Sequence, residues 1–372
     1  MKALKVIPAL FLALCAALPL TGQESDSPLQ KVLDYLTTVD MDQEAVYSPR
    51  PRLNVTMMND LRRTGVNQTY SFDQKGSSGE TIPVTASFGL HERLYTGLGL
   101  YVGYGGLLLG ASREIGNKSA ERSRSFTFDQ IGSSNGIQFR YYDIQQPMTY
   151  TLQMGKNKES GTTEKPGRMK TFTLSAFHAL NQKSFAYPAV YRGNLLQRRS
   201  AGSWMVSAKY LQGSVQTDPT EDISRLVYGL TRQATYQFSL GAGYSYNYVF
   251  LHRQPARREE KGLRNLTANC TLLPMLPLMD RHRITRQVSD PVTGLNASKE
   301  TRPVNSTFRI NCLTQAGLAY TYDRLFLALT AEYDGFSFRG TTKVTDSGAS
   351  TDIKTAGHFR RWSATIHCRV EF

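Results

Sequence analysis

Tryptophan and cysteine are rare in this chain of 372 residues, and long apolar runs are missing after the first twenty. Two Trp and four Cys stand against 20 Tyr, 17 Phe and 30 Gly. Beyond residues 6–20 no stretch approaches the ~18 apolar residues of a membrane helix, and the mean hydropathy is −0.37. The mature chain is therefore either secreted and soluble or crosses a membrane as strands, and its aromatic- and glycine-rich composition favours strands with tight turns.

The N-terminus has the pattern of a secretory signal peptide. Lys2 and Lys5 precede an apolar run at 6–20, and small residues follow before a polar stretch begins. We therefore predict a signal peptide at 1–22, a periplasmic N-terminal segment at 23–50 and one β-barrel domain at 51–372. A lipoprotein signal ending at Cys15 is the alternative, but the bulky Leu14 and the apolar residues after Cys15 disfavour it.

The mature chain is basic. Without Lys2 and Lys5, 42 Lys and Arg face 30 Asp and Glu, a net charge of +12. No RNP, helix-turn-helix or zinc-finger pattern accompanies this charge, so nucleic acid is not expected as a partner. Anionic outer-membrane lipid, including the phosphates of lipopolysaccharide, is the expected partner.

Three cysteines remain after removal of the signal peptide: Cys270, Cys312 and Cys368. An odd number cannot form a closed disulfide framework, and the spacing does not match a metal site. We predict no cofactor and no metal.

The last strand carries the clearest pattern in the chain. Apolar and polar residues alternate without interruption to the final residue, as in the closing strand of an outer-membrane barrel. The apolar positions are Trp362, Ala364, Ile366, Cys368, Val370 and Phe372, and the polar positions are Ser363, Thr365, His367, Arg369 and Glu371.

The same alternation recurs upstream. It predicts strands in 52–58, 82–90, 98–104, 123–131, 137–141, 172–176, 204–210, 233–250, 263–275, 305–322 and 325–338. Many of these runs reach the ~9–11 residues that cross a bilayer at a tilt, and their apolar faces end in tyrosine clusters. Together with the last strand they predict an all-β, transmembrane, antiparallel up-and-down barrel of about twelve strands, with ten to fourteen possible.

Connection lengths alternate between short and long. Tight turns are predicted at 91–93, 132–135 and 323–324, and long loops at 60–80, 154–168, 213–232, 276–304 and 339–358. This alternation is typical of short periplasmic turns and long external loops. The segment 181–201 is long on the short-turn side, and we expect it to fold into the barrel mouth as a constriction whose deletion raises conductance.

Charged residues on the polar faces are the candidate lumen lining. They are Arg140, Lys209, Arg309, Glu332, Asp334, Arg361, His367, Arg369 and Glu371. They either line a selective pore or form an internal ion-pair network that fills a narrow barrel. No catalytic constellation is recognisable: His178 is expected on the exterior and His367 in the lumen, and neither has an evident serine partner.

Four stretches resemble one protein family. They are 185–191 and 197–203 (QRRSAGS), 244–250, and Leu272-Leu273-Pro274. These residues resemble a Bacteroidota outer-membrane family catalogued as domain of unknown function 4421. The resemblance implies an outer-membrane β-barrel and supplies no activity and no catalytic residues.

We therefore predict a barrel in the cell outer membrane of a Gram-negative bacterium, with both termini periplasmic. The expected function is a narrow pore or a structural envelope component, not an enzyme. The expected partners are outer-membrane lipid and, through the C-terminal strand, the barrel-assembly machinery. The alternatives are a barrel enzyme acting on membrane lipid and a secreted soluble β-protein that binds carbohydrate or a surface polymer.

Overall fold

The computed structural model describes residues 41–48, 53–75, 78–92, 94–104, 107–115, 122–132, 134–218, 229–253, 262–288, 298–307, 309–346 and 349–372. The predicted signal peptide at 1–22 lies outside the described residues, as does most of the segment at 23–50. No helix in the described ranges is long and apolar enough to cross a membrane.

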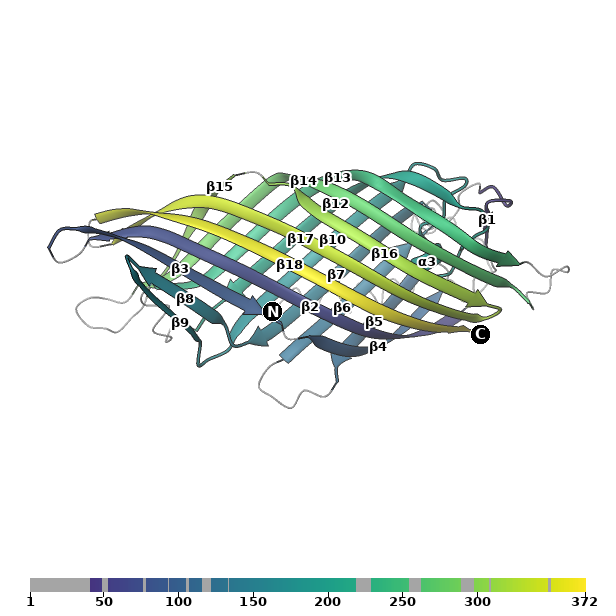
Figure 1. Cartoon of the computed structure of the whole chain (residues 1–372), viewed down its shortest axis with the longest axis horizontal. Helices are drawn as coiled ribbons and strands as arrows, with labels where there is room; N and C mark the ends of the chain where they lie inside the picture. Colours follow the sequence, from purple (N-terminus) through teal and green to yellow (C-terminus); the bar gives the residue numbers. More distant parts are fainter. Residues whose placement is uncertain are drawn as a thin grey trace.

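Antiparallel strands make up almost all of the structure (Figure 1). They are β1 (Val46–Tyr47), β2 (Leu53–Lys75), β3 (Thr81–His91), β4 (Tyr95–Tyr104), β5 (Leu107–Glu114), β6 (Arg122–Ile131), β7 (Asn135–Gln146), β8 (Thr149–Met154), β9 (Asn157–Thr162), β10 (Gly167–Ala179), β11 (Leu196–Gln197), β12 (Ala201–Gln216), β13 (Leu230–Arg253), β14 (Arg264–Val288), β15 (Ser298–Thr307), β16 (Asn311–Tyr322), β17 (Leu325–Asp346) and β18 (Ala349–Glu371). A short helix, α3 (Pro188–Tyr191), precedes β11.

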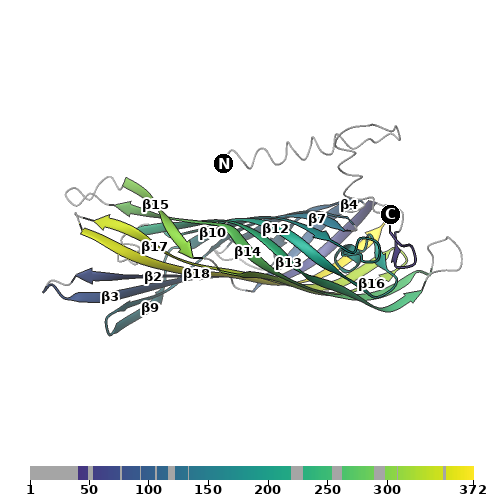
Figure 2. The ribbon, with the colours of Figure 1, turned by 90° about the horizontal axis from the view of Figure 1, so that it is seen from above.

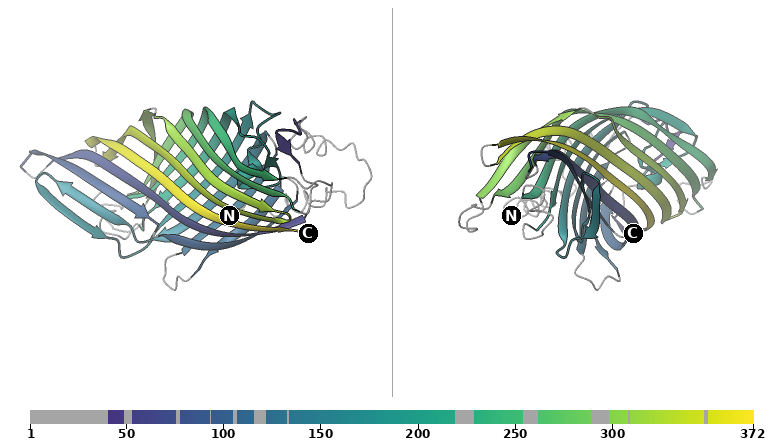
Figure 3. Two further views of the ribbon diagram at one scale, coloured as in Figure 1. Left: turned by 45° about the vertical axis from the view of Figure 1, so that its right-hand side comes forward. Right: turned by 60° about the vertical axis from the view of Figure 1, so that its left-hand side comes forward.

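Twelve strands close into a ring, so the predicted up-and-down barrel is confirmed. Around the ring the order is β18, β2, β4, β5, β6, β7, β10, β12, β13, β14, β16 and β17. The ring closes where β18 pairs with β17 on one side and with β2 on the other (Figure 3). We call the end where β2 begins and β18 ends the base of the barrel.

One predicted turn is wrong although the strand number is right. Both β3 and β4 pair antiparallel with β2, so the chain does not reverse at 91–93. The two strands lie end to end along β2 and together occupy one position in the ring. The reversal comes after Tyr104, where β5 begins and pairs with β4. β5 was missed because Leu107, Leu108 and Leu109 are apolar in succession and give no alternation.

Three of the predicted long loops are also wrong, since they are largely strand. β2 extends to Lys75, β14 to Val288 and β17 to Asp346. β13, β14, β17 and β18 have 24, 25, 22 and 23 residues, about twice the ~9–11 that cross a bilayer. The barrel is therefore longer than a membrane-spanning segment.

The character of the outward-facing side chains divides the barrel into two halves along its axis. From Trp362 to the last residue the outward positions include Ile366 of β18 and Phe372, which are 54% and 68% exposed. This stretch rises about 25 Å along the axis at ~3.3 Å per residue and a tilt of about 40°, which is about the height of the apolar band of such barrels. We call this the membrane half, and the rest, which holds residues 349–361 of β18, the outer half.

The hydrophobic phase is inverted in the outer half. There Phe338 and Phe359 point inward and are buried, while Arg339 and Arg360 point outward. This inversion is the physical reason why these segments do not show the apolar-out alternation of the membrane half. At the far end β2, β3, β8 and β9 continue as a projecting sheet (Figure 2), because β8 pairs with β3 and β9 with β8.

The three cysteines are free thiols on outward positions of the membrane half. Cys270 is exposed, whereas Cys312 and Cys368 are partly covered by neighbouring side chains. They occupy the apolar face, where a reduced cysteine behaves as a small apolar residue.

Candidate functional site in the barrel interior

Eight of the nine predicted lumen residues project into the interior. They are Arg140, Lys209, Glu332, Asp334, Arg361, His367, Arg369 and Glu371. The ninth, Arg309, differs from the prediction: it lies in the break between β15 and β16, and its charge acts on His358 of the exterior. The break shifts the inward phase from even positions (Val304) to odd positions (Asn311), which is why the alternation misplaced Arg309.

Five of these residues form an ion-pair ladder across the lumen. Glu332 of β17 bonds to Arg140, which comes from β7 on the opposite wall, and to Arg361 of β18. The next acid on β17, Asp334, accepts from Lys209 Nζ at 2.5 Å and lies 3.6 Å from Arg361. Their side chains are at most 18% exposed, so each charge depends on its partner for the interactions that water would otherwise supply.

A second charged cluster, which the sequence reasoning missed, surrounds Arg62 of β2. Arg62 Nη2 and Nε donate to the Glu92 carboxylate at 3.0 and 3.2 Å, and Ser123 Oγ donates to the same carboxylate at 2.6 Å. The guanidinium lies 4.1 Å from the ring centroid of Tyr95 and 4.6 Å from that of Tyr142. The region 60–80 was interpreted as a loop, and continued alternation beyond Asp60 was the signal that could have revealed Arg62.

A polar chamber of about 100 Å³ lies beneath the two clusters. Asp60, Arg62, Glu332 and His367 line it from the wall, and Tyr187 closes it from the base side. Such a volume has room for only a few water molecules. The acids and bases of its lining are paired with one another, so the chamber shows no excess charge that would select an ion.

The segment 181–201 lies inside the base, as the sequence reasoning placed it. The hydroxyl of Tyr191 donates to Asn269 Oδ1 of β14 at 2.6 Å, and that of Tyr187 donates to Gln315 of β16. α3 lies close to the wall, since a Cβ on Gly317 would come within 2.6 Å of Val190 Cγ1. We call residues 181–197 the plug.

Two buried arginines hold the C-terminal side of the plug. Arg369 of β18 donates to the carbonyl oxygens of Arg192 and Gly193, the latter at 2.9 Å. Arg192 in turn forms an ion pair with Asp129 of β6. Gly193 has φ +62° and lies against Phe326, so a side chain here would be strained and would clash.

The segment before the barrel covers the plug from outside. β1 pairs with β11, and Arg198 N donates to the Ala45 carbonyl at 2.7 Å. The fully buried Gln197 side chain links the two layers, because its amide donates to the carbonyls of Ala45 and Ser184 at 3.2 and 2.6 Å. Residues 41–48 and the plug therefore close the base together.

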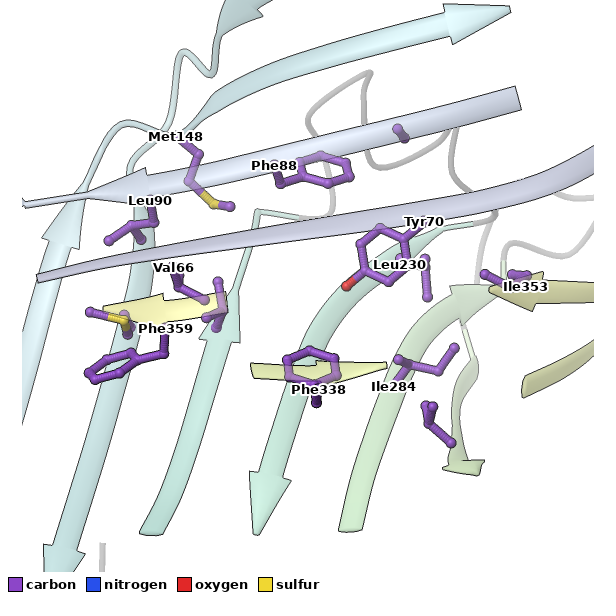
Figure 4. Close-up of a cluster of buried hydrophobic side chains, with 14 of the residues drawn as sticks. Val66, Tyr70, Phe88, Leu90, Met148, Leu230, Ile284, Phe338, Ile353 and Phe359 are labelled. Carbon is purple, nitrogen blue, oxygen red and sulfur yellow. The ribbon is translucent and has the colours of Figure 1, made fainter. Parts of the chain in front are cut away.

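The interior of the outer half contains an apolar core of 22 buried residues. Figure 4 shows ten of them as labelled side chains that point toward one another from several strands: Val66, Tyr70, Phe88, Leu90, Met148, Leu230, Ile284, Phe338, Ile353 and Phe359. We call these 22 residues the outer core. The barrel interior is thus filled, from the base outward, by the plug, the small polar chamber, the ion-pair ladder and the outer core.

The two histidines singled out from the sequence have no serine partner in the described part of the chain. His178 contacts Asn135 and Gln182, and His367 contacts Thr330 Oγ1 at 3.0 Å, so neither histidine is bonded to a serine there. Within the same residues no three His, Cys, Asp or Glu side chains are grouped to hold a metal ion.

Comparison with known proteins identifies a family for part of the chain. Residues 84–254 match the family described as "Domain of unknown function (DUF4421)". The resemblance predicted from the sequence is therefore confirmed over this region, while an origin in Bacteroidota stays a prediction. No curated protein matches the chain.

Solved barrels are similar to this chain only distantly. The outer membrane protease OmpT from Escherichia coli shares 6% identity at a TM-score of 0.38, covering 86% of this chain and 97% of its own. The toluene transporter TodX from P. putida shares 7% identity at a TM-score of 0.21, covering 91% and 93%. Similarity at this level does not bear on the function of this chain.

Proposed function

We propose that this protein is an outer-membrane barrel that is closed to diffusion and serves as a structural component of the envelope. The outer core carries this proposal. An ion that entered this cluster of 22 apolar side chains would lose its hydration, at a cost of several kcal/mol or more. Of the two predicted alternatives, pore and structural component, the geometry favours the second.

The exterior supports the location in the outer membrane. Aromatic rings form a continuous outward row across β6, β7, β10 and β12, with centroids 5.6, 5.0 and 6.1 Å apart. The row joins Phe126, Phe139, Phe172 and Tyr210. Such a row is typical of the interfacial girdle of an outer-membrane barrel. In a soluble β-protein the apolar face of Trp362–Phe372 would be exposed to water, at a large cost in free energy.

Orientation follows from the connections. The chain end and three short connections, β4–β5, β6–β7 and β16–β17, lie at the base, so the base would face the periplasm and the outer half would project from the cell. β18 would then be the strand that the barrel-assembly machinery receives, and its pairing with β2 the last step of closure.

Closure at two levels changes the expectation for the plug. A constriction at the base alone would open when residues 181–197 are removed. The outer core lies in series with the plug, so removal of the plug leaves the lumen closed. The structure therefore argues against our expectation that deletion alone raises conductance.

Planar-bilayer recording on the purified full-length protein tests the proposal. We expect no steady single-channel conductance, and sustained ion currents from correctly folded protein would contradict it. Cell fractionation with heat-modifiable gel mobility separates the barrel from the soluble alternative, since a soluble protein would be found outside the membrane fraction. Release of fatty acid from defined phospholipid vesicles tests the alternative of a lipid-acting enzyme.

A further inference from the structure

A cluster of basic side chains lies on the exterior just above the apolar band. Arg309, Arg339, His358 and Arg360 come from the break after β15, from β17 and from β18, and we call these four residues the basic patch. On β18 His358 and Arg360 are next-but-one neighbours on the outward face, about 7 Å apart along the strand. Arg339 pairs in register with Ala356 and is thus diagonal to His358, within reach of a long side chain.

Two features describe the electrostatics of this patch. Burial and the charges of Arg309, Arg360 and Arg339 lower the pKa of His358, so the four side chains share one field. The outward positions of β17 from Tyr333 to Lys343 and of β18 from Lys354 to Trp362 carry no acid. Like charges held together in this way repel one another, and an anion placed among them would relieve that repulsion.

The height of the patch on the barrel indicates the kind of anion. Directly below it Tyr333 and Trp362 pair in register on the exterior, and they are the last large exposed apolar side chains on their strands before the patch. Aromatic side chains at this level mark the boundary between hydrocarbon and headgroups. The patch therefore lies where the phosphate groups of a lipid anchored in the outer leaflet would be found.

The basic surface continues onto the neighbouring strands. Trp362 pairs in register with Arg63 of β2, and the charge of Arg63 acts on His91 of β3. A lipid with two separated phosphate groups would meet basic side chains at both, over β2 and β3 and over β17 and β18. Arginine suits this role, because its guanidinium binds two phosphate oxygens at once.

We propose that the basic patch binds the phosphate groups of a phosphorylated glycolipid of the outer leaflet, of the lipid A type. The aromatic pair Tyr333–Trp362 packs beside its acyl chains, and the arginines of the patch hold its phosphates. This proposal is independent of whether the lumen conducts, so a failure here would leave the closed barrel untouched.

Native mass spectrometry of the full-length protein in detergent micelles tests the proposal, with diphosphoryl lipid A as the probe. The wild type retains the lipid, and the double variant Arg309→Gln/Arg360→Gln binds it about tenfold or more weakly, since each basic side chain near an anionic surface contributes appreciably. The control Arg264→Gln/Arg324→Gln removes two exposed charges at the base and leaves binding unchanged. Heat-modifiable gel mobility verifies that each variant is folded.

A second variant keeps the test decisive if the first does not fold. Arg309→Lys/Arg360→Lys preserves the charge but removes the bidentate geometry, and it should bind with intermediate affinity. Unchanged lipid A binding in folded Gln or Lys variants would overturn the proposal, as would an equal loss in the base control. Inorganic phosphate that displaces lipid A completely at millimolar concentration would show a site for free phosphate and would overturn the assignment to lipid.

Discussion

Tyr70 of β2 donates a hydrogen bond of 2.8 Å to Gln233 Oε1 of β13, and these strands belong to opposite walls of the ring. A bond this short between opposite walls means that the lumen is flattened in the outer half. Arg140 and Glu332 make a second contact between opposite walls at the ion-pair ladder. The barrel is therefore held closed by direct bonds through its interior.

The Tyr70 bond can be removed with little change of shape. Tyr70→Phe leaves Gln233 Oε1 buried without this donor, and its Nε2 already lacks a partner in the described structure. We expect the free energy of unfolding to fall by about 1–2 kcal/mol, measured as a lower urea midpoint in micelles. Tyr236→Phe on the outward face of β13 is the control, and an equal effect of both variants would show that the cross-lumen bond is not the cause.

The ion-pair ladder should be far more sensitive to the loss of one acid. Glu332→Gln leaves Arg140 and Arg361 in the interior without their shared carboxylate, and breaking such a buried pair costs about 3–5 kcal/mol. The matched control is Asp143→Asn, whose partner Arg168 is 46% exposed, so its loss should cost at most about 1 kcal/mol. Thermal shift of heat-modifiable mobility measures both, and a Glu332 variant as stable as the control would contradict the buried ladder.

The sequence reveals the membrane half well because water and lipid impose opposite demands on its two faces. The outward phase of Trp362 and Phe372 is readable from the alternation, and so is the inward phase of Arg361 and His367. In the outer half this contrast is inverted: apolar side chains such as Phe359 fill the interior, and arginines face water. Those segments were therefore interpreted as loops although they are strands.

The candidate site was predictable only in part for a related reason. Lys209 and Glu332 lie on strands with clear alternation, but nothing local says which charges meet across the lumen. Pairing between β7 and β17 depends on ring order and on how far the barrel is flattened. Alternation beyond Asp60 could have placed Arg62 inside the barrel, but its bond to Glu92, thirty residues away, leaves no pattern in either segment.

Conductance should appear only when both the plug and the outer core are opened. Deleting residues 184–197 alone leaves the outer core intact and gives no steady current. Combining the deletion with Phe88→Ser and Phe338→Ser places hydroxyls and a large void in the core, and channel events should then appear in planar bilayers. Phe88→Leu and Phe338→Leu with the same deletion is the apolar control; currents from the deletion alone would show that the outer core is not a barrier.

Release of the plug should be observable without any current. Arg369→Gln removes the donors that bind the Arg192 and Gly193 carbonyls. We expect amide hydrogen exchange of residues 190–197 to rise about tenfold, as loss of a charged hydrogen bond costs about 1.5–3 kcal/mol, while exchange in β13 stays constant. Arg264→Gln, which lies near the base but does not contact the plug, is the control; equal exchange in wild type and Arg369→Gln would contradict the role of Arg369.

Histidine titration provides an electrostatic test of the basic patch. His358 lies outside the membrane half, and its pKa is lowered from the ordinary 6.5 by burial and by Arg309, Arg360 and Arg339. Positive neighbours disfavour the protonated ring, so Arg360→Gln should raise the pKa of His358. A bound phosphate should raise it in the wild type for the same reason, since an anion favours the protonated form. NMR titration of the His358 ring measures both shifts. Lys354→Gln, four positions beyond His358 on the same face, should change the pKa less than Arg360→Gln, and the reverse order would contradict a field dominated by the patch.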